Sequence, residues 1–158
     1  MPKVVILYDT LSGTTELLVK AVIEGLGTLE ELDLRLLKIG TKFSISSLAN
    51  TDAIIVGSPS IYGDMTPQLR TFLMNLHNLV KSKKFVLSRV KGAVFGSYEW
   101  DGGWHVERIG ELLVDIGIRL VTPPLAVVDQ GGRLKIHPRD IEQCRDLGQN
   151  VALSLINN

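Results

Sequence analysis

The chain is short of several features that define common classes of protein. Among its 158 residues there is a single cysteine, Cys144, which excludes an internal disulfide and a cysteine-based metal cage. Lysine and arginine together number 17, as do aspartate and glutamate, so no excess of charge points to nucleic acid or an anionic membrane. The three histidines, at positions 77, 105 and 137, are scattered, and no metal site is expected.

Long apolar runs are scarce as well. No segment approaches the roughly 20 apolar residues that a helix needs to cross a bilayer, so no membrane insertion is expected. The start, Met1-Pro2-Lys3, runs directly into an apolar segment and leaves no room for a signal peptide. With 45% apolar residues the chain is long enough to bury a core. We therefore expect one cytoplasmic domain that spans residues 1–158.

Short apolar runs alternate along the chain with longer segments of helical period. The strands predicted from this pattern are 3–8, 53–56, 93–95 and 125–128, with a half-exposed edge strand at 32–36. The predicted helices are 14–26, 66–78, 104–116 and 139–156, with Gly25, Gly27 and Gly117 as expected stops. The alternation predicts an α/β fold: a flavodoxin-like, doubly wound, five-stranded parallel sheet of order 2-1-3-4-5 with helices on both faces. In that order strands 1, 3 and 4 are neighbours, so the loops that follow them should line one crevice.

The first of these loops is rich in hydroxyl groups. Four hydroxyl side chains and a glycine, with no lysine or arginine, occur over Thr10, Leu11, Ser12, Gly13, Thr14 and Thr15. Backbone N–H groups, hydroxyls and the positive end of a helix dipole would converge there, as in a phosphate site. Because these donors are neutral, the loop suits a phosphomonoester better than a nucleoside triphosphate. The alternative is a plain helix N-cap, although a cap needs only one or two hydroxyls.

The loop after the third strand combines proline, an aromatic residue and glycine. Its candidate binding residues are Ser58, Pro59, Ser60, Ile61, Tyr62 and Gly63. A glycine there permits a positive φ angle close to a ligand. The alternative is a plain loop closed by Thr66 as N-cap and Pro67 as the first helical residue. That alternative explains Thr66 and Pro67 but leaves Tyr62 and Gly63 without a reason.

The loop after the fourth strand contains both tryptophans of the chain. Its candidate binding residues are Ser97, Tyr98, Glu99, Trp100, Asp101, Gly102 and Gly103. Two glycines let the backbone approach a ligand closely, and the aromatic residues offer flat apolar surface. We expect Tyr98 and Trp100, together with Tyr62 of the preceding loop, to face a cofactor. Trp104, which begins a helical stripe, is expected in the core.

A phosphate cradle beside two loops of glycine and flat aromatic residues suits FMN, an aromatic ring carried on a phosphorylated chain. No G-x-G-x-x-G pattern follows the first strand, which argues against a dinucleotide, and the P-loop pattern is absent. A response regulator shares this fold class but needs paired acids, a phosphorylatable aspartate and a lysine at three strand ends. Asp9 stands alone here, and Gly57-Ser58 and Gly96-Ser97 occupy the other two places.

These motifs make the chain similar to flavodoxin-like proteins, and the resemblance extends over its whole length. Thr10 to Thr15 match their phosphate-loop pattern T/S-x-T/S-G-x-T. Residues 95–103 are similar to the F-G-S-Y-G-W-S-G stretch that borders FMN in the flavodoxin domain of A-type flavoproteins, the flavodiiron proteins. Glu99 and Asp101 depart from that stretch and add two carboxylates beside the expected ring. The sequence has no counterpart of the metal-binding β-lactamase-like domain of those proteins, so no diiron chemistry is expected.

A second resemblance concerns residues 59–73. They are similar to the P-T-R-F-G-N-M and Q-x-R-x-F-L stretches of the tryptophan-repressor-binding NAD(P)H:quinone reductases, which also bind FMN. Together the resemblances imply FMN binding more firmly than they imply a reaction. Because nothing in the sequence supplies a separate nicotinamide domain, we favour a protein that carries electrons between a reductase and an acceptor protein. The alternatives are an FMN enzyme that oxidises NAD(P)H with a quinone, and a flavin-free interaction module that kept the fold. No side chain is assigned a catalytic role, and a homo-oligomer stays open.

Charged residues near the expected ring and elsewhere give two further hypotheses. Asp64, Glu99 and Asp101 would repel the negatively charged reduced flavin and lower its potential, which a redox titration of Glu99→Gln and Asp101→Asn tests. The alternative is that they point into solvent. The basic segment 81–91 is either a solvated face or a docking patch for an acidic redox partner. Cys144 lies on an apolar helical stripe and is expected in the core.

Overall fold

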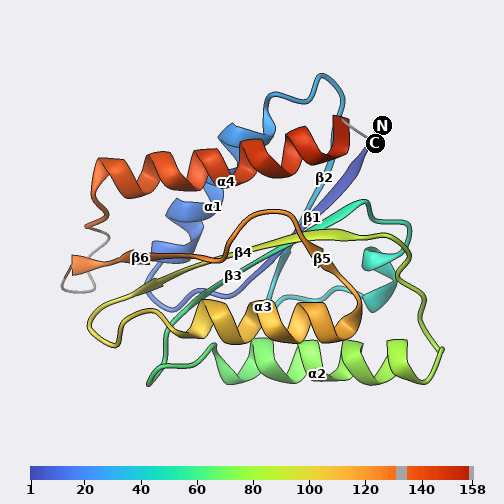
Figure 1. The fold of residues 1–158 in the computed structure, drawn as a ribbon. Coiled ribbons are helices and arrows are strands. Elements are labelled where there is room, and N and C mark those ends of the chain that lie inside the picture. The colour runs from blue at the N-terminus through green and yellow to red at the C-terminus, as the bar shows by residue number, and fades with distance from the viewer. Residues whose placement is uncertain (131–134, 157–158) are drawn as a thin grey trace.

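The computed structural model describes residues 1–130 and 135–156, so parts of the expected domain, 131–134 and 157–158, lie outside the described residues. Its centre is a parallel sheet of order β2-β1-β3-β4-β5, with β6 also paired to β4 (Figure 1). The strands are β1 (Lys3–Tyr8), β2 (Asp33–Lys38), β3 (Ala53–Pro59), β4 (Lys91–Tyr98), β5 (Arg119–Leu120) and β6 (Leu125–Val128). The predicted fold class and strand order are confirmed.

The fifth position of the sheet is shared by two short strands. β5 pairs with β4 at Lys91 and Gly92, and β6 pairs with the other end of β4, from Phe95 to Tyr98. The segment between them, 121–124, contains two consecutive prolines. Proline has no N–H to donate to a neighbouring strand, so the edge is interrupted there. The predicted strand 125–128 is therefore the second half of a broken edge.

Two helices cover each face of the sheet. The helices are α1 (Thr14–Leu26), α2 (Pro67–Lys81), α3 (His105–Ile116) and α4 (Pro138–Ile156), with a short 3-10 helix η1 (Ile45–Leu48). Figure 1 shows α1 and α4 on one side of the sheet and α2 and α3 on the other. Along β1, Val4 and Ile6 enter the core under α1 and α4, and Val5 and Leu7 enter the core over α2 and α3. Burial on both faces explains why the central strands read as unbroken apolar runs.

Several of the helix ends predicted from the sequence are found in the structure. The Thr66 hydroxyl accepts the Leu69 N–H, and Pro67 begins α2, as predicted. Gly117, at φ 110°, ends α3, also as predicted. Gly27 follows the last residue of α1 as its C-cap, as predicted, whereas Gly25 lies inside the helix.

Gly25 instead lies where the backbones of α1 and α4 are in close contact. A Cβ atom on Gly25 would overlap the backbone carbonyl oxygen of Arg145 in α4, and one on Gly148 would overlap that of Val22 in α1. Only glycine fits at both positions. Beside this contact Cys144 is fully buried, as predicted, and burial raises the pKa of its thiol to about 12. Among the described residues no helix is long and apolar enough to cross a membrane.

Replacing Gly148 by alanine should destabilise the protein by about 3 kcal/mol, because the added methyl group forces α1 and α4 apart. Gly110→Ala in α3 is the matched control. Its Cβ would meet only the Leu120 and Pro124 side chains, at 3.2 and 3.3 Å, and alanine favours a helix by about 1 kcal/mol over glycine. Urea unfolding measures both. Equal stability of the two variants would contradict the tight helix crossing.

Candidate functional site

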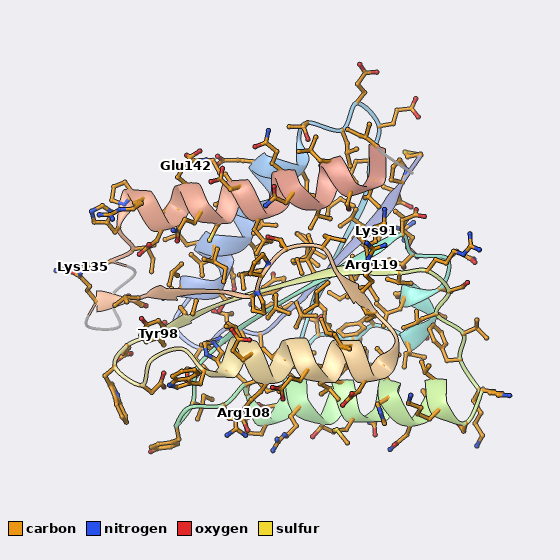
Figure 2. The ribbon with its side chains drawn as sticks, in the orientation of Figure 1. Lys91, Tyr98, Arg108, Arg119, Lys135 and Glu142 are labelled. Atoms are coloured by element: carbon orange, nitrogen blue, oxygen red, sulfur yellow. The ribbon has the colours of Figure 1, made fainter. Side chains whose placement is uncertain are left out.

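The loops after β1, β3 and β4 lie together at one edge of the sheet. Because all strands run parallel, their carboxyl ends share an edge, and β1, β3 and β4 are adjacent. In Figure 2, Tyr98 at the end of β4 lies on the opposite side of the molecule from Lys91 and Arg119. A hollow of about 270 Å³ opens here, lined by Leu11, Ser60, Ile61, Tyr62, Glu99, Trp100 and Asp101. The structure thus brings residues of all three predicted loops to one hollow.

The hydroxyl-rich loop makes a tight turn into α1. Gly13 precedes the helix at φ 94°, a left-handed conformation, and its N–H donates to the Thr10 hydroxyl over 2.9 Å. Thr15, in the first turn of α1, is buried, and its hydroxyl has no hydrogen-bond partner among the described residues. A buried hydroxyl without a partner is costly unless a ligand completes it.

Asp129, which the sequence reasoning missed, supports this loop from behind. It is buried directly after β6, and its carboxylate accepts the Thr14 hydroxyl and, over 3.2 Å, the Lys135 N–H. The Ser12 hydroxyl lies 3.2 Å from that of Thr14. Since the Thr14 proton goes to Asp129, Thr14 positions the turn. The one sequence signal that could have identified Asp129 is its position as a lone acid directly after the last predicted strand.

Asp9 ties the first loop to the second. Its carboxylate accepts the Thr10 N–H over 2.8 Å and the Thr66 hydroxyl over 2.6 Å. The end of β1 and the start of α2 are therefore fixed to each other through one buried acid. In the sequence Asp9 is recognisable only as an isolated acid.

The second and third loops are joined by Asp101. Its carboxylate accepts the Ser60 hydroxyl over 2.6 Å and the Gly103 N–H over 3.1 Å. Burial alone would raise the pKa of Asp101, but these hydrogen bonds, with smaller contributions from His105 and the Gly63 N–H, hold it below its ordinary value. Asp101 is therefore ionised at neutral pH and holds the two loops together.

The turn at the tip of the second loop is strained. Ile61 and Asp64 exchange backbone hydrogen bonds of 2.7 and 3.0 Å. Between them Tyr62 and Gly63 both take positive φ angles, of 49° and 82°. A bulky residue such as tyrosine rarely adopts this conformation. Its side chain is 93% exposed, so no packing within the described chain accounts for it.

The aromatic residues of the site divide into exposed and half-buried ones. Trp100 is 78% exposed at the rim, and Tyr98 is half-buried, with its ring beside Gly103. Trp104, expected in the core, is 68% exposed, so that prediction was wrong. The buried stripe of α3 begins one residue later, at His105.

The remaining charged residues of the hypotheses are spread over the surface. Glu99 is exposed, and Asp64 pairs with Arg70 of α2 at 3.4 Å. The basic segment 81–91 joins α2 to β4 and so lies at the opposite edge of the sheet from the three loops. A partner docked on that segment would not touch the hollow. The described residues contain no group of three or more histidine, cysteine or acidic side chains placed to hold a metal ion.

Comparison with known proteins places the chain in a family. The flavodoxin family model matches residues 6–148. A nitric oxide reductase of Moorella thermoacetica is 30% identical over 155 residues, which are 95% of this chain and 35% of that protein. The rubredoxin oxygen:oxidoreductase of Desulfovibrio gigas matches with a TM-score of 0.81 at 24% identity, over 98% of this chain and 36% of the other. A flavodoxin from the domain Archaea matches with a TM-score of 0.78 at 25% identity, over 98% and 99%.

The chain belongs to the flavodoxin family. It has the flavodoxin-like fold and the FMN cofactor that the sequence resemblance implied. It spans about a third of the length of the first curated relatives that it matches.

The described site fits this cofactor in its chemistry. Neutral donors at a helix N-terminus, among them the unpartnered hydroxyl of Thr15, suit a phosphate group. The exposed aromatic residues Tyr62 and Trp100 offer apolar surface at the hollow that a flat ring could cover.

His105 makes the stability of this site depend on pH. It is fully buried, and burial lowers the pKa of its imidazole below the ordinary value, so the unfolded chain binds a proton at a higher pH than the folded one. The free energy of unfolding should fall as the pH drops below about 6.5, with a slope of at most about 1.4 kcal/mol per pH unit. His105→Gln should remove this part of the slope in urea unfolding, and the exposed His137→Gln should leave it. An unchanged slope in His105→Gln would contradict the assignment.

Proposed function

We propose that FMN binds across the three loops, with its phosphate at residues 10–15 and its ring between residues 58–63 and 97–103. The observation that carries this proposal is the buried Thr15 hydroxyl, which has no partner within the described chain and lies in the first turn of α1. The helix dipole adds a favourable potential for an anion at this point. The neighbouring carboxylate of Asp129 opposes a second negative charge, so the neutral hydroxyl and N–H donors supply most of the attraction.

The ring is proposed to lie in the hollow bounded by Leu11, Tyr62 and Trp100. These side chains are 67%, 93% and 78% exposed, an unusual concentration of apolar surface at one edge of the sheet. Covering them with a flat ring gains hydrophobic free energy. Tyr62 and Trp100 are the candidates for the two faces of the ring, and Tyr98, half-buried, supports the third loop from within.

Bound FMN supplies the redox chemistry, because flavins accept and donate one or two electrons. The chain supplies binding and orientation. Asp101 fixes the distance between the second and third loops through Ser60 and Gly103, and Asp9 fixes the second loop to the first. The loops are thus positioned before the ligand arrives, which reduces the entropy lost on binding.

We further propose that the protein carries electrons between separate redox proteins. Sequence relatives three times its length include proteins named nitric oxide reductase and flavorubredoxin, in which a flavodoxin-like part is joined to other parts. The exposed apolar rim of the hollow, with Glu99 beside it, offers a surface on which a partner can dock. A reductase would reduce this chain, and a second redox protein would oxidise it.

Substituting valine for Thr15 should lower FMN affinity by about 10- to 100-fold, because a hydrogen bond to a charged group contributes about 1.5–3 kcal/mol. The unfolding free energy of the ligand-free protein should not fall, since the lost hydroxyl has no partner. Thr51→Val is the matched control: its hydroxyl is also buried and unpartnered, but it lies at the opposite edge, before β3. Affinity is measured by quenching of flavin fluorescence. An equal loss of FMN affinity in both variants would contradict the assignment of the phosphate to this loop.

Anaerobic mixing separates the carrier from an enzyme that oxidises NAD(P)H. With NADPH and a quinone alone, the FMN-loaded protein should stay oxidised for minutes. Addition of a catalytic amount of an NADPH-dependent flavodoxin reductase should bleach the flavin, and cytochrome c should restore its colour. Rapid turnover without the reductase would contradict the carrier and support the quinone reductase. A colourless protein that binds no FMN would leave only an interaction module.

A further inference from the structure

A buried histidine lies directly behind the two loops that are proposed to hold the flavin ring. His105 is the first residue of α3 and is fully buried. Its Nε2 atom lies 2.9 Å from the carbonyl oxygen of Ser58, near the end of β3. A Cβ atom on Gly96 of β4 would overlap Nε2. The chain thus has a glycine in β4 where the imidazole needs room.

Only one of the two ring nitrogens is used. Nδ1 of His105 is buried and has no hydrogen-bond partner among the described residues. A buried polar atom left without a partner is uncommon and costs free energy. The backbone carbonyl of Gly103, in the third loop, lies where it favours the protonated form of the ring.

The charges that face His105 come from both loops. Asp101 of the third loop and Asp64 of the second favour its protonated form, and burial opposes it. Asp64 is partly neutralised by Arg70 of α2 at 3.4 Å, and Asp101 is held by Ser60 and Gly103. His105 is neutral in this balance. Further negative charge between the loops would shift the balance towards the imidazolium ion.

We propose that His105 is a proton-binding site linked to the charge of the ligand between the second and third loops. When electrons from a redox partner reduce bound FMN, Nδ1 takes up one proton from solvent, and it releases that proton when the electrons leave. No covalent bond forms or breaks at His105 apart from this N–H bond. The imidazolium then donates from Nε2 to the Ser58 carbonyl of the second loop, and its positive charge faces the Asp101 and Asp64 carboxylates. This inference rests on the proposed function.

A merely structural role for His105 would give different results. A histidine that only fills space and donates to Ser58 would bind its proton equally well whether the flavin is oxidised or reduced. A linked proton site must bind its proton more tightly in the reduced protein, and the midpoint potential must then rise as the pH falls. Tenfold tighter proton binding corresponds to about 59 mV for a one-electron step.

The test uses the fact that the chain contains only three histidines. Nuclear magnetic resonance of protein labelled with ¹⁵N at its histidines follows the protonation of each imidazole against pH, before and after reduction by dithionite, in the protein loaded with FMN. His105 should bind its proton at least tenfold more tightly after reduction. The exposed His137, which begins the turn into α4, should be unaffected. Identical titration of His105 in the two states would overturn the inference.

The midpoint potential of bound FMN gives an independent measurement. In His105→Gln, where an amide can still donate to Ser58, the potential should lose part of its dependence on pH between 5 and 8, whereas His137→Gln should keep it. An unchanged dependence in His105→Gln would overturn the inference. If that variant fails to fold, the nuclear magnetic resonance titration of His105 in the unsubstituted protein is sufficient to test the inference.

FMN binding is measured before either experiment, by flavin absorbance and fluorescence quenching. A protein that binds no FMN overturns the proposed function and this inference together. A protein that binds FMN but whose His105 does not respond to reduction overturns only the inference.

Discussion

The structure depends on the parallel pairing of β1, β3 and β4, three adjacent strands buried on both faces. Burial of both faces fixes the register, because a slip by one residue would exchange the two cores. Parallel direction then brings the carboxyl ends of all three strands to one edge. The hydroxyl-rich loop, the strained turn at Tyr62 and the glycine-rich loop after β4 meet there only for this reason. The same strand pairing therefore both buries the apolar residues and places the site.

Three acids stabilise the loops at that edge. Asp9 accepts the Thr66 hydroxyl, Asp101 accepts that of Ser60, and Asp129 accepts that of Thr14. Each joins the end of one strand to a different loop or helix start, so the hollow is shaped before a ligand binds. The same acids make the site negative. The proposed phosphate site therefore relies on neutral hydroxyls, backbone N–H groups and the dipole of α1, and His105 is the group proposed to take up positive charge next to the ring.

The strand order and the three loops could be predicted from the sequence because they depend on local patterns. Runs such as Val4–Leu7 are apolar throughout, and hydroxyls and glycines follow them directly. The partners of Asp9 and Asp129 could not, since they lie 57 and 115 residues away. Trp104 was assigned to the wrong side of α3 because a helix start is uncertain by one residue, and one residue rotates a side chain by about 100°. The interruption of the sheet edge at 121–124 could not be predicted, because it depends on where the two prolines lie relative to β4.

The central claim is that the hydroxyl-rich turn binds the phosphate of FMN. Titration of the ligand-free protein with FMN and with riboflavin, which has the same ring but no phosphate, tests it most directly. Several hydrogen bonds to a charged group contribute about 1.5–3 kcal/mol each, so FMN should bind at least about 100-fold more tightly than riboflavin. Equal affinity for the two flavins would contradict the account.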